Sequence, residues 1–173
     1  MKKGGGKQKG TSFERVLCKA LSLWVSDGQR EDLYWRSAMS GGRATVAKKK
    51  GKDLANVAGD ICAVHPDGNA LTDTYFIEAK HLASLNYAEF ILKDTGKIAD
   101  YWKKAHEQAA AHRKIPMLIL KQNFCPVVAA FPLRRLCIEP LAHIFKRDCT
   151  MVFFDDLTAS PFQQFMSVRR LLK

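Results

Sequence analysis

The sequence predicts an α/β fold in which a mixed central β-sheet is flanked by helices. One observation behind this prediction is the order of apolar patterns along the chain: helix, several strands, helix, strands, helix. The other is size, because 173 residues with 47% hydrophobic content suit one domain with a sizeable core. We find no internal repeat, and we expect a single domain over residues 11–173.

The N-terminal segment is predicted to be a basic arm followed by a helix. Residues 1–10 are Gly and Lys with one Gln and one Met, too polar to pack, and are expected to be flexible. From Phe13 to Trp24, apolar residues recur at the spacing of an amphipathic helix, which should end near Asp27 and Gly28. A short strand is expected in residues 32–37, "DLYWRS".

Two further strands are predicted to form an antiparallel hairpin. They cover "GDICAV" (59–64) and "DTYFIEAKHL" (73–82), and turn-forming residues from Pro66 to Asn69 lie between them. The sequence numbers of two residues that face each other in an antiparallel hairpin add up to the same total along the whole pair. The midpoint between Asp60 and Glu78 is Asn69, which lies in the predicted turn. The two carboxylates are therefore expected to face each other.

The C-terminal half supplies the remaining elements. We expect a helix over 97–113, strands at "PMLIL" (116–120), "VVAAF" (127–131) and "TMVFF" (150–154), and a helix from Pro161. Four aromatic residues are assigned to the core: Trp24, Tyr34, Trp35 and Trp102.

Composition favours a nucleic-acid partner. The formal net charge is +11, from 28 Lys and Arg against 17 Asp and Glu, and neutralising phosphates gives sequence-independent affinity. Charge for solubility alone is the alternative. No apolar run approaches the roughly 20 residues that span a bilayer, and no signal peptide is recognisable. We expect a cytoplasmic protein of a bacterial or phage-infected cell, without membrane contact and with its five scattered cysteines reduced.

The stretch "TYFIEAKHL" (74–82) places charges inside a strand. Phe76, Glu78 and Lys80 share one face, where a solvated ion pair is the simpler interpretation. Carboxylates of Asp60 and Glu78 on opposite strands would repel by about 1 kcal/mol or more unless a cation lies between them. Mg²⁺ suits such ligands, and Lys80 could then orient water, act as a general base if its pKa were lowered, or stabilise developing negative charge.

These residues resemble the PD-(D/E)XK nuclease superfamily, with "GD" at Gly59-Asp60, "EAK" at 78–80 and "FER" at 13–15. The order "GTSFERVLCKALSLWV", "WRSAMSGGR", "GDI" and "FIEAK" is most similar to phage and archaeal Holliday-junction-resolvase-like endonucleases. The resemblance covers roughly residues 10–122 and implies a restriction-endonuclease-like core. It departs from the family pattern at Gly59, where the family name has Pro.

The resemblance also implies a reaction centre. Its catalytic residues would be Glu14, Asp60, Glu78 and Lys80, and Mg²⁺, for which Mn²⁺ is expected to substitute, would be held by Asp60, Glu78, the Ala79 carbonyl and Glu14. The implied reaction is DNA phosphodiester hydrolysis to a 5′-phosphate and a 3′-hydroxyl, on branched DNA such as a four-way junction and by a homodimer. For Glu14 a capping box with Thr11 remains an alternative.

A Gly- and Lys-rich segment after the first predicted strand is a candidate for phosphate contact. The candidate DNA-binding residues are Arg36, Ser40, Gly41, Gly42, Arg43, Lys48, Lys49, Lys50 and Lys52. Gln108 is a candidate accessory residue, or equally a structural amide with satisfied hydrogen bonds.

Three other functions stay open from sequence alone. One is a restriction-like or repair nuclease that cuts duplex DNA. Another is a non-catalytic nucleic-acid-binding module with the same fold, against which the complete set of Asp60, Glu78 and Lys80 argues. The third is an anion-binding interaction protein unrelated to DNA.

Overall fold

The computed structural model describes residues 5–37, 58–132, 141–144 and 147–167. The elements in this part of the chain are, in order, α1 (Gly5–Val25), β1 (Tyr34–Arg36), β2 (Ile61–Ala63), the 3₁₀ turn η1 (Pro66–Gly68), α3 (Asn69–Thr74), β3 (Tyr75–Leu82), the π-helical turn η2 (Glu89–Lys93), α4 (Gly96–Ala111), β4 (Ile115–Gln122), β5 (Val128–Phe131), β6 (Ala142–Ile144), β7 (Cys149–Phe153), α5 (Phe154–Ala159) and α6 (Phe162–Ser167).

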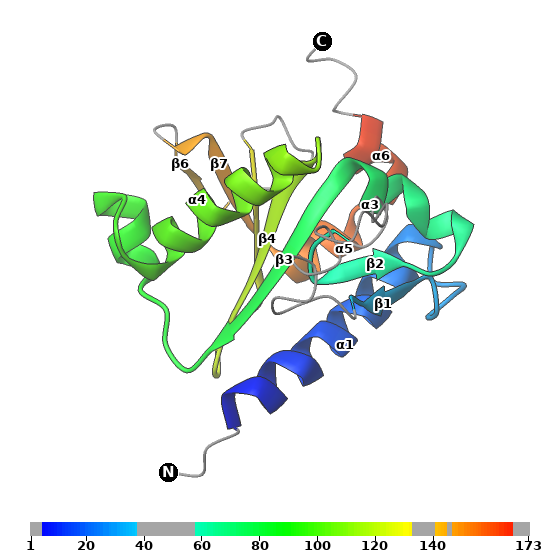
Figure 1. Cartoon of the computed structure of the whole chain (residues 1–173), viewed down its shortest axis with the longest axis horizontal. Helices are drawn as coiled ribbons and strands as arrows, with labels where there is room; N and C mark the ends of the chain where they lie inside the picture. Colours follow the sequence, from blue (N-terminus) through cyan, green and yellow to red (C-terminus); the bar gives the residue numbers. More distant parts are fainter. Residues whose placement is uncertain (1–4, 38–57, 133–140, 145–146, 168–173) are drawn as a thin grey trace, which may run out of the picture.

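The centre of the fold is a five-stranded sheet in the order β3-β4-β5-β7-β6. β3 and β4 run parallel, and every other neighbouring pair in this sheet is antiparallel. β1 and β2 form a separate two-stranded antiparallel sheet. The predicted α/β class with a mixed sheet flanked by helices is confirmed (Figure 1).

Helices cover both faces of the five-stranded sheet (Figure 1). On one face, α1, α5 and α6 pack on the residues of β3, β4, β5 and β7 whose side chains point that way, such as Ile77 and Ile119. On the other face, Ile98 and Trp102 of α4 pack against Leu118 and Leu120 of β4. Adjacent strand residues alternate between these two cores, as the pleat requires.

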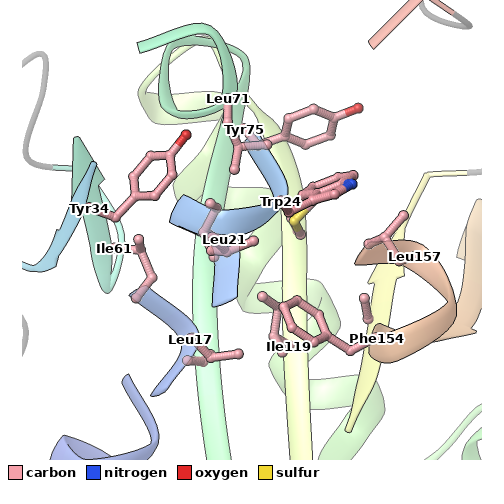
Figure 2. Packing of buried hydrophobic residues seen from close by; sticks show 14 of the residues in the cluster. Leu17, Leu21, Trp24, Tyr34, Ile61, Leu71, Tyr75, Ile119, Phe154 and Leu157 are labelled. Carbon is pink, nitrogen blue, oxygen red and sulfur yellow. The ribbon is translucent and has the colours of Figure 1, made fainter. Parts of the chain in front are cut away.

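The larger core joins elements that are far apart in sequence. Figure 2 shows Leu17, Leu21 and Trp24 of α1 in one cluster with Ile119 of β4 and Phe154 of α5. The indole Nε1 of Trp24 donates a 2.7 Å hydrogen bond to the carbonyl of Ser160, so the C-terminal segment is tied to α1. The predicted amphipathic stripe of the first helix is therefore its packing face.

The first helix begins earlier than the sequence predicts. α1 starts at Gly5, so residues 5–10 are helical, where a flexible arm over residues 1–10 was expected. Once a helix is nucleated, each added residue gains a backbone hydrogen bond, and Lys7, Gln8 and Lys9 are good helix formers. Thr11 consequently lies inside the helix, and the capping-box role considered for Glu14 does not apply.

The predicted hairpin is wrong. β2 pairs with β1, and β3 pairs in parallel with β4, while the segment between β2 and β3 forms η1 and α3. Pro66 occupies the first position of η1, a place that suits its fixed φ, and Leu71 and Thr74 of α3 are buried. The same turn-forming residues permit either a hairpin turn or a short helix. Burial of α3 stabilises the helix.

The C-terminal predictions are confirmed in their main features. α4, β4, β5 and β7 match the expected helix and strands, and α6 follows Pro161. Trp24, Tyr34 and Trp102 are buried, but Trp35 is 57% exposed, contrary to the core assignment, because it points outward from the β1–β2 sheet. In the described part of the chain, every helix is too short or too polar to span a bilayer.

Candidate active site

Glu78 and Lys80 project from β3 on the side of the sheet that α4 covers. In the parallel register they lie beside Leu118 and Leu120, which pack against α4. Lys80 Nζ lies 6.0 Å from the centre of the Tyr101 ring on α4. The charged face of the strand is thus partly enclosed by the helix above it.

Asp60 reaches the same place from the segment that precedes β2. Its backbone N–H donates to the carbonyl of Ile77 at 2.8 Å, and its carbonyl accepts from the N–H of Ser37 at 2.8 Å. Its side-chain Oδ2 accepts a 2.9 Å hydrogen bond from the backbone N–H of Ala79. The two backbone bonds therefore hold Asp60 between Ser37 and β3, and the bond from Ala79 holds its carboxylate along the outer edge of β3.

Gly59 permits this close approach. It has φ +94, a conformation that L side chains rarely adopt, and it forms a parallel bridge with Ile77. A Cβ at this position would lie 2.5 Å from the carbonyl oxygen of Ile77. Pro, whose ring fixes φ near −65°, could not adopt this backbone conformation. The departure of this chain from the Pro of the family name is thus a structural requirement here.

The Lys80 ammonium is surrounded by the oxygen atoms that the sequence assigned to a cation. Nζ forms a short ion pair with Glu78 Oε1, lies 3.7 Å from Asp60 Oδ2 and donates to the Ala79 carbonyl at 3.2 Å. The exposed fractions of the side chains are 11% for Asp60, 14% for Glu78 and 26% for Lys80. A solvated surface ion pair, the simpler interpretation from sequence, does not describe these side chains.

The electrostatics of the site favour a charged lysine. Burial raises the pKa of Glu78 and the nearby charge of Asp60 raises it further, while Lys80 and Lys104 offset part of the rise. Burial alone would lower the pKa of Lys80, but the carboxylates of Glu78 and Asp60 outweigh it and hold this pKa above its ordinary value. A neutral Lys80 acting as general base, one of the roles considered from sequence, would need the opposite shift.

Glu14 has a different partner. Its Oε2 accepts a 2.9 Å hydrogen bond from Arg36 Nε in an ion pair with side chains 13% and 30% exposed. Arg36 also donates to Thr11 Oγ1 at 3.4 Å. The structure thus brings Asp60, Glu78 and Lys80 together and places Glu14 with Arg36. Among the described residues, no group of three or more His, Cys, Asp or Glu is placed to hold a metal ion.

α4 contributes residues that sequence reasoning left out. Tyr101 and Lys104 lie on the same flank of the helix as Gln108, and their spacing of three and then four residues is the signal that could have found them. The Oε1 atom of Gln108 is buried and has no hydrogen-bond partner in the described structure. The interpretation of Gln108 as a fully satisfied structural amide is therefore not supported.

Of the candidate DNA-binding residues, Arg36 is described and is engaged by Glu14. The others lie outside the described residues: Ser40, Gly41, Gly42, Arg43, Lys48, Lys49, Lys50 and Lys52.

Comparison with protein families matches residues 5–169 of the chain to the family described as "Phage putative PDDEXK endonuclease". No curated protein and no solved structure matches the chain. The match extends well beyond residues 10–122, where the motifs were recognised, and covers α5 and α6.

Proposed function

Because the chain belongs to this family of phage PDDEXK endonucleases, we propose that it is a Mg²⁺-dependent endodeoxyribonuclease whose reaction centre is formed by Asp60, Glu78 and Lys80. The observation that carries the proposal is the position of Lys80 Nζ, which contacts Glu78 Oε1 and the Ala79 carbonyl and lies 3.7 Å from Asp60 Oδ2. Three oxygen atoms from separate residues are directed at one positive charge.

The donor set fits a hard divalent cation. Two carboxylates and one backbone carbonyl are the ligand types that Mg²⁺ and Mn²⁺ take, and Mg²⁺ accepts few protein ligands because it keeps waters and substrate oxygens. Asp60, Glu78 and the Ala79 carbonyl would hold the ion. When bound, it would polarise the phosphodiester and lower the pKa of a coordinated water.

Lys80 acts as a cation in this proposal. As an ammonium it can donate hydrogen bonds to the attacking water or to the phosphate oxygens on which negative charge develops. Ala79 and Asp60 position it, because the Ala79 N–H fixes the Asp60 carboxylate beside it. Glu14 supports the site through its ion pair with Arg36, the residue before Ser37, whose backbone N–H donates to the carbonyl of Asp60.

The proposed substrate is branched DNA, on the strength of the resemblance to resolvase-like endonucleases. A homodimer would present two such sites to opposed strands of a four-way junction. The net charge of +11 supports a polyanionic substrate, whether branched or linear. Linear duplex is the alternative substrate.

The test is cleavage of matched DNA substrates: a synthetic four-way junction, linear duplex and single strand, each with Mg²⁺ and with chelator. We expect Mg²⁺-dependent cleavage that is faster on the junction and that falls at least about 100-fold in Asp60→Asn, Glu78→Gln and Lys80→Met. Equal rates on junction and duplex would overturn the branched-DNA proposal. Cleavage unchanged by Glu78→Gln would overturn the site, and DNA binding without any cleavage would favour a non-catalytic module.

A further inference from the structure

Helix α4 presents different residues on the two flanks of its buried stripe. The stripe consists of Ile98, Trp102, Ala105 and Ala109. At 100° per residue, Tyr101, Lys104 and Gln108 share one flank and Lys103 lies on the other. The ring of Tyr101 lies 6.0 Å from Lys80 Nζ, which fixes the first flank as the one turned toward the reaction centre.

Lys104 is an unengaged cation on this flank. Its side chain is exposed, and no ion pair joins it to a carboxylate among the described residues. Its charge nevertheless acts on the Glu78 carboxylate. Lys80, in contrast, is already paired with Glu78 and close to Asp60. Lys104 is thus free to meet an incoming anion near the reaction centre.

The charge balance of the site calls for such a group. Before a divalent cation binds, Asp60 and Glu78 contribute two carboxylates against the single ammonium of Lys80, so the metal-free site repels a phosphate. A lysine on the flank of α4 that is turned toward the site offsets this repulsion without competing for the same oxygen atoms. Lysine also binds phosphate as a point charge and needs no fixed orientation.

We propose that Lys104 is a substrate-binding residue that contacts a backbone phosphate of the nucleic-acid strand entering the reaction centre. The proposal deepens the proposed nuclease function and rests on it. It assigns the flank of α4 formed by Tyr101, Lys104 and Gln108 as the wall along which this strand lies. The opposite flank, with Lys103, has no part in binding.

Lys103 provides a matched control. It neighbours Lys104 in sequence, is also exposed, and lies at a similar angle from the buried stripe on the other side. Lys103→Ala and Lys104→Ala remove the same charge from the same helix, and neither should alter folding, because both side chains are exposed. Equal thermal unfolding of the two variants checks this.

The experiment measures anisotropy of a labelled four-way junction in chelator at several salt concentrations, for wild type, Lys104→Ala, Lys104→Arg and Lys103→Ala. Loss of one phosphate contact removes about 0.9 from the slope of log affinity against log salt, equivalent to roughly eightfold weaker binding near 0.1 M salt. We expect this weaker binding and smaller salt slope for Lys104→Ala, and near wild-type values of both for Lys104→Arg. For Lys103→Ala we expect less than about a twofold change in affinity.

Cleavage with Mg²⁺ separates this inference from the proposed function. We expect Lys104→Ala to raise KM by a similar factor with little change in kcat, as loss of uniform binding does. If wild type does not cleave, the proposed function fails, while the anisotropy series still tests the contact. If wild type cleaves and Lys104→Ala equals Lys103→Ala in affinity and salt slope, the assignment of Lys104 is overturned and the proposed nuclease function stands.

Discussion

The carboxylate of Asp60 accepts a 2.9 Å hydrogen bond from the backbone N–H of Ala79, the residue between Glu78 and Lys80. This bond uses a donor at the outer edge of β3, on the side away from β4. An edge strand leaves such donors unpaired by neighbouring strands. The side chain of Asp60 therefore pairs with a donor that a neighbouring strand would otherwise occupy. The same hydrogen bond places the Asp60 carboxylate beside Glu78 and Lys80.

The first prediction concerns Gly59, which lets Asp60 approach β3. Gly59→Ala introduces a Cβ 2.5 Å from the Ile77 carbonyl at a position with φ +94. We expect a loss of about 2–4 kcal/mol in the free energy of unfolding, measured by denaturant titration, because the clash adds to the backbone strain. Activity should fall further, since Asp60 would move from Ala79.

Gly28 is the control for this substitution. It also has positive φ, +80, but a Cβ there meets nothing within 4 Å. Gly28→Ala should therefore show only the conformational cost, about 1 kcal/mol. Equal destabilisation of the two variants would show that the contact with Ile77 is not what requires glycine at position 59.

A second prediction follows from the place of the Lys80 ammonium among the oxygens of Asp60, Ala79 and Glu78. Lys80→Met leaves the two carboxylates without their cation, so the chelated protein should lose about 2–4 kcal/mol of stability. Added Mg²⁺ should raise the melting temperature of this variant more than that of wild type, because the ion replaces the missing charge. Differential scanning fluorimetry with chelator and with Mg²⁺ measures both effects.

Lys103→Met removes an exposed lysine from α4 and is the matched substitution. Its stability and its response to Mg²⁺ should equal those of wild type. A Lys80→Met protein that responds to Mg²⁺ no more than Lys103→Met does would contradict the idea that ammonium and metal ion serve the same oxygen atoms.

A third prediction concerns pH. Burial and the charge of Asp60 raise the pKa of Glu78 above its ordinary value of 4.5, and a divalent cation binds the deprotonated carboxylate. Metal affinity should therefore begin to fall, as pH is lowered, at a higher pH than for an ordinary glutamate, and by about tenfold per pH unit below the pKa. Calorimetric titration with Mn²⁺ across a series of pH values measures it. Affinity that begins to fall only where an ordinary glutamate, with a pKa of 4.5, becomes protonated would contradict a raised pKa of Glu78.

The sequence predicted the proximity of Asp60 and Glu78 but not the way it arises. A hairpin would have placed them on opposed strands, whereas a glycine-mediated contact at the sheet edge carries Asp60 to β3. The turn-forming residues from Pro66 suit both a β-turn and the start of a helix, and local pattern cannot choose between them. Burial of Leu71 in the core, a tertiary effect, favours the helix over the turn.

The residues contributed by α4 show a second limit of sequence reasoning. The helix was predictable from periodicity, and Gln108 was recognised as a candidate accessory residue or structural amide. Which flank faces Glu78 depends on the direction in which α4 crosses β3, and this follows from the parallel pairing of β3 with β4. Lys104 could therefore be separated from Lys103 only once the fold was known.

The last prediction concerns Glu14, which the family resemblance implied to be a metal ligand and which the structure pairs with Arg36 at 2.9 Å. We expect Glu14→Gln and Arg36→Gln each to cost about 1 kcal/mol in unfolding free energy, and the double variant to cost little more than either, since both single changes break the same partly buried pair. Mn²⁺ affinity from calorimetry should equal that of wild type in all three. If Glu14→Gln lowers it tenfold while Arg36→Gln does not, Glu14 is a metal ligand, and its ion pair with Arg36 must open when the metal binds.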